Sequence, residues 1–202
     1  MTDFSGITIT ELAAIIAGHL QQQGIDVVLV GGLAVEIYTH NLYLTKDIDM
    51  VNTNYQRPQT LHKAMAELGF SKQGRVYVNA TTDITVEFPP GPLSVGNELI
   101  RTTTVAQMAH GSIPILRVED VIKDRLAAFI HWGDKQSLVQ ATAILLTHQL
   151  APAAFQGFCL NEEARIEYQL LETLYQCANQ KQLTTMEQLQ TELTRVLLDA
   201  MK

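Results

Sequence analysis

The order of patterns along the sequence predicts an α/β or α+β fold, in which a small mixed sheet with flanking helices is followed by a helical C-terminal half. Two observations carry this prediction. Short β-branched runs alternate with helix-like segments over the first part of the chain. From about residue 117 onward the pattern is helical alone. We therefore expect an α/β core over residues 1–115 and a helical region over residues 116–202.

Composition limits the classes of protein that this chain can be. It has 202 residues, of which 47% are hydrophobic, so we expect a folded core. A net charge of −7 argues against a broad surface for phosphate groups but leaves room for a local basic pocket. No apolar run approaches the roughly 18 residues that span a bilayer, and the start MTDFSGITITEL does not resemble a signal peptide. The two cysteines form no CxxC motif. We expect a cytoplasmic protein without a membrane partner.

The first element is a predicted helix at residues 11–23. Thr8 and Glu11 have the spacing of a capping box, in which each residue satisfies a backbone N–H of the other. Gly24 supplies a C-terminal stop, because glycine readily adopts the left-handed conformation that ends many helices.

A strand and a glycine pair follow. IDVVLV, at residues 25–30, is long enough for a buried strand and too short for a buried helix. It ends at Gly31 and Gly32, and LAVEIYTH then resumes helical spacing. Bare backbone N–H groups at such a turn can approach an anion. Taken alone, the pair is better explained as a tight turn between a strand and a helix.

The second predicted strand, DIDMV at residues 47–51, contains two carboxylates. Residues two apart in a strand project from the same face, so Asp47 and Asp49 should point the same way. Carboxylates this close repel each other, and a divalent cation relieves the repulsion. Mg²⁺ prefers oxygen ligands and often shares its shell with substrate phosphates, with Mn²⁺ as an alternative. A solvated strand end is the simpler explanation of the same Asp-x-Asp motif.

The predicted core continues with a helix at residues 58–68, closed by Gly69, and strands at 75–80 and 83–88. The last strand carries Glu87, which shares a face with Thr85. An exposed edge position explains a lone glutamate as well as a role in binding does.

In chain order these features are a strand, Gly-Gly, a helix, an Asp-x-Asp strand and a later strand with an acidic residue. GGLAVEIYTHNLYLTKDIDMV (31–51) followed by VEF (86–88) resembles the pattern of the nucleotidyltransferase superfamily. The likeness is greatest to minimal bacterial nucleotidyltransferase-like proteins, including toxin components of toxin–antitoxin pairs. It covers about residues 25–90, and residues 117–141 more loosely.

The resemblance implies roles for individual residues. Asp47 and Asp49 would hold Mg²⁺ on a nucleoside triphosphate, and Glu87 would help to bind metal and favour deprotonation of an acceptor hydroxyl. Gly31 and Gly32 would offer backbone donors to the phosphates. The implied reaction moves a nucleoside monophosphate from the triphosphate to a hydroxyl acceptor and releases pyrophosphate.

Asp83 competes with Glu87 as the third carboxylate. Two features keep an alternative function open, because Gly32 stands where many active members have serine and the sequence has no obvious basic patch for an acceptor. The alternative is a catalytically weak or inactive nucleotidyltransferase-like protein that binds a nucleotide or a protein partner. If the protein is active, its charge favours a small-molecule or protein acceptor over RNA. The resemblance also admits an antitoxin partner.

The helical region supplies two cations that could bind phosphate. Arg125 lies within an apolar stripe, so its guanidinium needs a carboxylate or phosphate partner. An internal ion pair, with one of the acidic strand residues as a candidate, is the structural alternative. Lys135 lies at the edge of the next apolar face, where it could reach a phosphate or extend into water. Helices are expected near residues 118–131, 134–149, 161–178 and 185–201.

Two further predictions concern packing in this region. Trp132 is expected to pack between helices rather than to stack on a base. The last helix is expected to pack its apolar face, Met186, Leu189, Leu193, Val196, Leu197 and Ala200, into the core.

Overall fold

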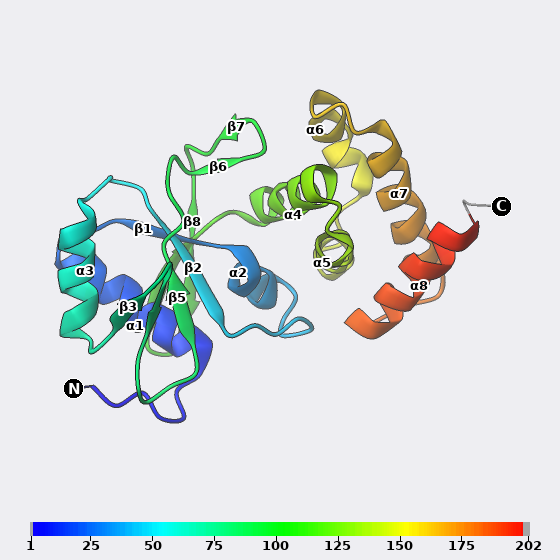
Figure 1. The fold of residues 1–202 in the computed structure, drawn as a ribbon. Coiled ribbons are helices and arrows are strands. Elements are labelled where there is room, and N and C mark those ends of the chain that lie inside the picture. Colours follow the sequence, from blue (N-terminus) through cyan, green and yellow to red (C-terminus); the bar gives the residue numbers. More distant parts are fainter. Residues whose placement is uncertain (1, 200–202) are drawn as a thin grey trace. The chain divides into compact units, whose positions relative to one another are not determined.

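A seven-stranded mixed sheet forms the first part of the structure, which is a computed structural model describing residues 2–199 (Figure 1). The chain divides into two compact units, which we describe separately. The first contains the chain up to Ala34, Leu44–Ser94 and Leu99–Arg117. The second contains Val35–Tyr43, Val95–Glu98 and the chain from Val118 onward.

The elements before the helical half alternate between helices and short strands. They are α1 (Ile9–Gln22), β1 (Val27–Val30), α2 (Gly31–Tyr38), β2 (Asp47–Asn52), α3 (Pro58–Glu67), β3 (Ser71–Gln73), β4 (Val76–Val78), β5 (Thr85–Glu87), β6 (Ser94–Val95), β7 (Glu98–Leu99), β8 (Thr104–Met108) and β9 (Gly111–Ile115). The remaining elements are α4 (Val118–Trp132), α5 (Lys135–Thr147), the 3₁₀ helix η1 (Pro152–Phe155), α6 (Gln156–Asn161), α7 (Arg165–Gln180) and α8 (Met186–Asp199). The predicted fold class, a mixed sheet with flanking helices and a helical C-terminal half, is confirmed.

The main sheet has the strand order β3-β4-β5-β2-β1-β9-β8. Strand β1 pairs antiparallel with β2 and parallel with β9, while β2 pairs parallel with β5. The outer pairs β3–β4, β4–β5 and β8–β9 are antiparallel. Strands β6 and β7 form a separate two-stranded sheet.

One face of the main sheet packs against α1. A Cβ built on Gly111 of β9 would contact Ala14 of α1 at 3.6 Å, so this face of β9 is turned toward the helix. Ile115 lies on the same face and pairs with the fully buried Leu29, which in turn pairs with Met50. Helix α3 packs against α1 and β3 (Figure 1). Successive residues of a strand point to opposite faces of the sheet, so the neighbours of Leu29 and Met50 project from the face opposite α1.

The start and the end of helix α1 follow the capping signals found in the sequence. Thr8 accepts a hydrogen bond from the Glu11 amide at 3.3 Å, and the Glu11 carboxylate accepts one from the Thr8 amide at 3.0 Å. The capping box is thus complete, and the helix begins at Ile9, two residues before the predicted start. Gly24 follows its end in the left-handed region, with φ of +72°.

Strands β8 and β9 were not predicted. Strand β9 contains Pro114, which cannot donate a ladder hydrogen bond, and the alternate positions of β8 are partly or fully exposed. Strand β8 therefore lacks the buried apolar alternation that indicates a strand, and in β9 the alternation is limited to Ile113 and Ile115 on either side of the proline. Strand β3 was missed for the same reason, because all three of its residues are exposed.

The second unit is built from helices that pack in pairs, α4 with α5, α7 with α8 and α5 with both α7 and α8. Leu189, Leu193 and Val196 of α8 are buried, as predicted. Ala200, the last position of the predicted stripe, and residue 201 of the predicted helix lie outside the described residues. The segment predicted as one helix at 161–178 is α7, which begins at Arg165 and follows the short helices η1 and α6.

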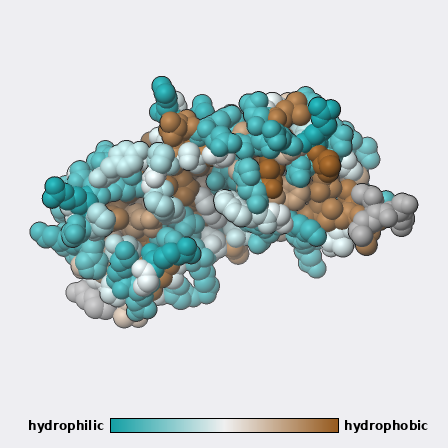
Figure 2. Space-filling view, turned by 45° about the horizontal axis from the view of Figure 1, so that its top comes forward, coloured by the Kyte–Doolittle hydropathy of each residue, from teal (hydrophilic) through white to brown (hydrophobic). Residues whose placement is uncertain are grey.

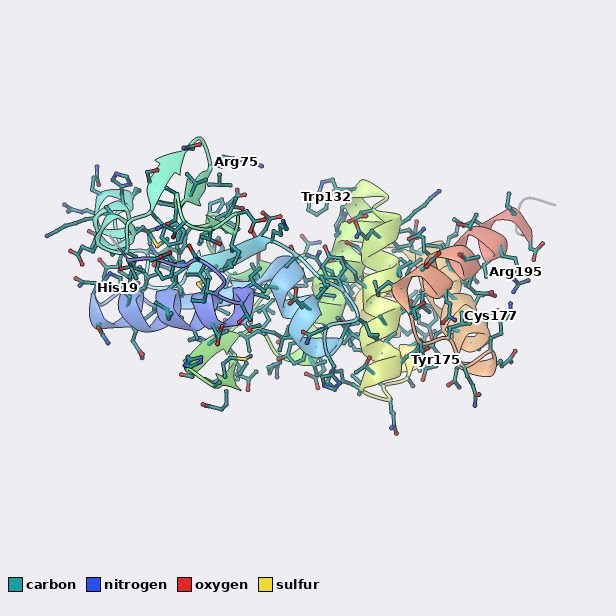
Figure 3. The ribbon with its side chains drawn as sticks, turned by 90° about the horizontal axis from the view of Figure 1, so that it is seen from below. His19, Arg75, Trp132, Tyr175, Cys177 and Arg195 are labelled. Carbon is teal, nitrogen blue, oxygen red and sulfur yellow. The ribbon has the colours of Figure 1, made fainter. Side chains whose placement is uncertain are left out.

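The prediction for Trp132 is wrong. This side chain is 79% exposed at the end of α4, where it projects outward and contacts the ring of His131 edge-on (Figure 3). The glycine that follows, Gly133, has φ of +63° and ends the helix. Trp132 therefore lies on the last turn, beyond the helix positions that pack.

Apolar surface lies over α7 and α8 (Figure 2), where Ile166, Leu170, Val196 and Leu197 line a groove of ≈ 410 Å³.

No helix between residues 2 and 199 has both the length and the apolar character needed to cross a membrane.

An ion-pair network around the buried carboxylate of Glu192 joins α8 to Lys181, the residue that follows α7. The Glu192 side chain is 7% exposed and accepts hydrogen bonds from Arg195 at 2.5 and 3.1 Å and from Lys181 at 2.6 Å. These two cations, Arg195 foremost, lower the pKa of Glu192 to about 2 although burial acts in the opposite direction. The network therefore stabilises the folded state when Glu192 is ionised.

Replacing Glu192 by Gln should lower the stability of the protein by about 1–2 kcal/mol at pH 7, because charge-assisted hydrogen bonds are lost. An unfolded glutamate titrates near pH 4.3, roughly, so the native advantage should be complete above that pH. It should disappear as the pH falls from about 5 toward 2, where native Glu192 also becomes protonated. Chemical denaturation from pH 7 to pH 2 measures this. The exposed Glu187→Gln on the same helix is the control, and a deficit of Glu192→Gln that does not change with pH would contradict the account.

Candidate active site

The carboxylates predicted from the sequence lie on neighbouring strands in the first unit. Strands β2 and β5 run parallel, with Asp47 opposite Thr85 and Asp49 opposite Glu87. Paired residues project from the same face, and neighbouring strands are about 4.8 Å apart. The residues between them, Ile48 and Val86, are fully buried. All three carboxylates therefore lie on the face of the sheet opposite α1, and the predicted shared face of Asp47 and Asp49 is confirmed.

Gly31 lies directly against Asp49. It follows the last residue of β1, Val30, which pairs with Asp49 across the antiparallel ladder. Gly31 has φ of +67°, and a Cβ built on it would lie 2.4 Å from Oδ2 of Asp49. Only glycine fits both the left-handed backbone and this approach. Helix α2 begins at the same residue, so its N-terminus, with Gly32 as the second residue, starts beside the Asp49 carboxylate.

Asp47 and Asp49 differ in exposure. Asp47 is exposed at the start of β2 and accepts a hydrogen bond from the Thr85 hydroxyl at 2.5 Å. Asp49 is partly buried one pleat further along, in contact with the glycine turn. Thr85 thus fixes the outer carboxylate and Gly31 borders the inner one.

Glu87 has a partner that the sequence analysis missed. Nε of Arg75 lies 3.6 Å from Oε1 of Glu87, and the Arg75 side chain is 88% exposed (Figure 3). The contact follows from the register of β4 and β5, in which Val76 pairs with Glu87. The sequence predicted two strands joined by a tight connection, but not which residues of the two strands pair with each other. The contact between Arg75 and Glu87 depends on that pairing and was therefore not predicted. Arg75 places an exposed cation at the edge of the carboxylate face.

Asp83, the competing third carboxylate, is held elsewhere. It forms an ion pair with Lys46, just before β2 begins. The hydrogen bond and the charge of Lys46 lower the pKa of Asp83, and the same contact raises the pKa of Lys46. Glu87, and not Asp83, is therefore the residue that the sheet register sets beside Asp49.

The donors of this face suit a hard cation, because carboxylate oxygens are the ligands that Mg²⁺ prefers. Asp49 and Glu87 approach from neighbouring strands and Asp47 from one pleat away. With the side chains as they stand, no three His, Cys, Asp or Glu residues within 2–199 are grouped closely enough to hold a metal ion. The donor set fits the metal chemically, and binding would require a change of side-chain rotamer.

The two cations predicted to bind phosphate belong to the second unit. Arg125 contacts the neighbouring Asp124 through both Nε, at 3.0 Å, and Nη2, and it lies 3.4 Å from Oε1 of Gln140. The predicted need for a partner is met locally, so the partner is not an acidic strand residue. Lys135 is exposed at the first position of α5, after Asp134 caps the helix by accepting a hydrogen bond from the Gln136 amide.

Replacing Gly31 by Ala tests the contact with Asp49. The new Cβ would meet Oδ2 of Asp49, so we expect a loss of stability beyond the roughly 1–2 kcal/mol that a left-handed L-residue costs. Gly74→Ala is the matched control, because Gly74 has φ of +63° and open space around its Cβ. Urea denaturation measures both variants. Equal losses would show that Asp49 does not restrict this turn.

Comparison with known families gives one match. Residues 9–85 match the family described as "Nucleotidyl transferase of unknown function (DUF2204)". No curated protein and no solved structure matches the chain. The matched stretch runs from the start of α1 to the first residue of β5, so it contains Gly31, Asp47 and Asp49 and ends before Glu87. The match over residues 9–85 supports the resemblance to nucleotidyltransferase-like proteins that the motif predicted.

Proposed function

We propose that this protein is a Mg²⁺-dependent nucleotidyltransferase that moves a nucleoside monophosphate from a nucleoside triphosphate to a hydroxyl acceptor. One observation carries the proposal. Asp49 has the glycine turn that opens α2 on one side and Glu87 on the other. This arrangement would set a site for phosphate beside a site for a cation on a single face.

The triphosphate would bind at the start of α2. The first N–H groups of a helix have no partner within the helix and carry the positive end of its dipole. Gly31 and Gly32 present two of these groups without side chains in the way. Gly32 lacks the hydroxyl that serine would add, so the backbone would supply the contacts at this position.

Asp47, Asp49 and Glu87 would then hold the cation between the protein and the phosphates. The bound cation would neutralise the charge that develops on the phosphoryl oxygens. The acceptor oxygen forms a bond to the α-phosphorus while the bond from that phosphorus to the bridging oxygen breaks, and pyrophosphate leaves. Glu87 would help the acceptor hydroxyl to lose its proton, which passes to solvent.

Arg75 would change partner in this cycle. In the structure it offsets the charge of Glu87. Its exposed side chain has room to leave that carboxylate for a phosphate oxygen once a cation occupies the site. Arg75 would then bind the triphosphate from the β4–β5 side of the sheet.

A second candidate function is nucleotide binding without turnover. The pairing of Glu87 with Arg75 favours it, because a carboxylate held by arginine is less available to a cation or to an acceptor proton. The glycine at position 32 favours it as well, since one phosphate contact of the active pattern is missing.

A thermal-shift panel with each nucleoside triphosphate, with and without Mg²⁺, tests the proposal. We expect one triphosphate to raise the melting temperature, and only when Mg²⁺ is present. At a hundredfold excess over Kd, such binding stabilises the folded state by about 2.7 kcal/mol. Asp49→Asn should abolish this shift. Asp83→Asn is the matched control and should keep it, because Asp83 is engaged by Lys46.

Pyrophosphate release separates the two candidate functions. Release in the presence of a mixture of hydroxyl compounds, lost in Asp49→Asn, supports the transferase. A Mg²⁺-dependent shift without release from any mixture supports binding without turnover. A shift that survives in Asp49→Asn would overturn both, because the triphosphate would then bind elsewhere.

A further inference from the structure

The carboxylate face of the first unit also contains a cavity of ≈ 360 Å³. Its lining comes from β1, from the turn after β2 and from the segment between β5 and β8. A hydrogen bond from the Ile100 amide to the Leu93 carbonyl, at 3.0 Å, joins the residues on either side of the β6–β7 hairpin within that segment. The volume falls in the range of sites for small molecules.

The sheet register sets the cavity beside the carboxylates. Val28 lines the cavity and pairs with Val51, whereas Val30 pairs with Asp49. Val28 and Val30 are two residues apart on one strand, so they share a face and are separated by roughly 7 Å. The cavity therefore begins about one pleat from Asp49, on the side away from Asp47.

The cavity combines one cation with an apolar wall. Arg101 lines it, and within the described residues 2–199 its guanidinium has no hydrogen-bond or ion-pair partner. Leu99, which is 59% exposed, and Leu93 supply the apolar surface, and the hydroxyl-bearing Thr103 lies near Arg101 in sequence. A guanidinium beside an apolar wall suits a ligand with an anionic end and a small carbon body.

Tyr55 is held at the cavity in an unfavourable conformation. Its φ is +55°, in the left-handed region that non-glycine residues rarely adopt, and its side chain is 68% exposed. The turn is fixed by its neighbours, since Asn54 bonds to Asp26 and Gly24, and Asn52 to Gln56. A strained, exposed aromatic residue in a rigid turn lines a cavity without stabilising a core, which is a mark of binding sites.

We propose that this cavity binds the acceptor substrate, and that the acceptor is a small hydroxyl compound bearing a carboxylate or phosphate. The inference rests on the proposed transferase function. The anionic end would bind Arg101, the carbon body would lie against Tyr55 and Leu99, and the hydroxyl would point toward Asp49. The nucleoside is the poorer occupant, because its anionic charge lies on the triphosphate, for which Gly31 and Gly32 already supply donors.

The experiment measures binding of matched compounds to the full chain by thermal shift, without nucleotide. Three pairs differ in the anionic group, namely glucose 6-phosphate and glucose, glycerol 3-phosphate and glycerol, and 4-hydroxybenzoate and 4-hydroxybenzyl alcohol. Glucosamine adds a cationic probe. We expect at least one anion to raise the melting temperature, and its neutral partner and glucosamine to leave it unchanged. No shift with any of the three anions overturns the proposal.

Variants locate the binding. Arg101→Gln should abolish the anion shift, whereas Arg165→Gln, which removes the same charge from α7, should keep it. Tyr55→Asn should also reduce the shift while keeping or raising the melting temperature of the free protein, because asparagine tolerates the left-handed region. A structural role for Tyr55 predicts a lower melting temperature instead. An anion shift that survives in Arg101→Gln contradicts the proposal.

The same panel separates this inference from the function on which it rests. Arg101→Gln should leave the Mg²⁺-dependent triphosphate shift intact, and Asp49→Asn should leave the anion shift intact. Loss of the triphosphate shift in Arg101→Gln would assign the cavity to the nucleotide and overturn the acceptor proposal. An Arg101-dependent anion shift in a protein that binds no triphosphate would refute the transferase and keep the anion site. The compound that binds should then become nucleotidylated, as detected by mass spectrometry.

Discussion

The contact between the Gly31 backbone and the Asp49 carboxylate is the constraint on which the site depends. A strand ends, a helix begins without a linker, and the turn between them passes so close to Asp49 that a single added carbon would collide with it. The pairing of Val30 with Asp49 consequently fixes the backbone at the start of the helix relative to the backbone of Asp49. The Asp49 side chain then needs only its own two torsion angles to reach the turn.

The sheet keeps that contact in place through its buried face. Asp49 lies on a strand flanked by an antiparallel neighbour with Gly31 at its end and by a parallel neighbour with Glu87. A slip of β2 by one residue would turn both aspartates toward α1 and bring Ile48 and Met50 into solvent. Because these two side chains are fully buried, the register is strongly specified. The apolar residues of β2 thus determine where its polar residues lie.

Sequence reasoning succeeded where the signal is local and failed where it depends on pairing. The capping box of α1 and the alternation within β2 depend on neighbours in the chain, and both were predicted. The pairing of Arg75 with Glu87 requires the offset between two strands, which no local pattern encodes. The cavity beside the carboxylates could likewise not be predicted from the sequence, because Tyr55 and Arg101 come from separate loops. Trp132 shows the converse error, since an apolar residue on a helix need not face its core.

Strand β1 lies between β2 and β9, so its pairing is completed only late in synthesis of the chain. Its VVLV sequence has two hydrogen-bonding edges, and the second is covered only when β9 pairs with Leu29. β9 lies far along the chain, after the stretch that matches the family model has ended. During synthesis an apolar strand edge therefore stays open until residue 115 has emerged, and open edges of this kind recruit other chains. A fragment cut to the family match would retain that edge permanently, so the smallest segment in which both edges of β1 are paired extends through β9.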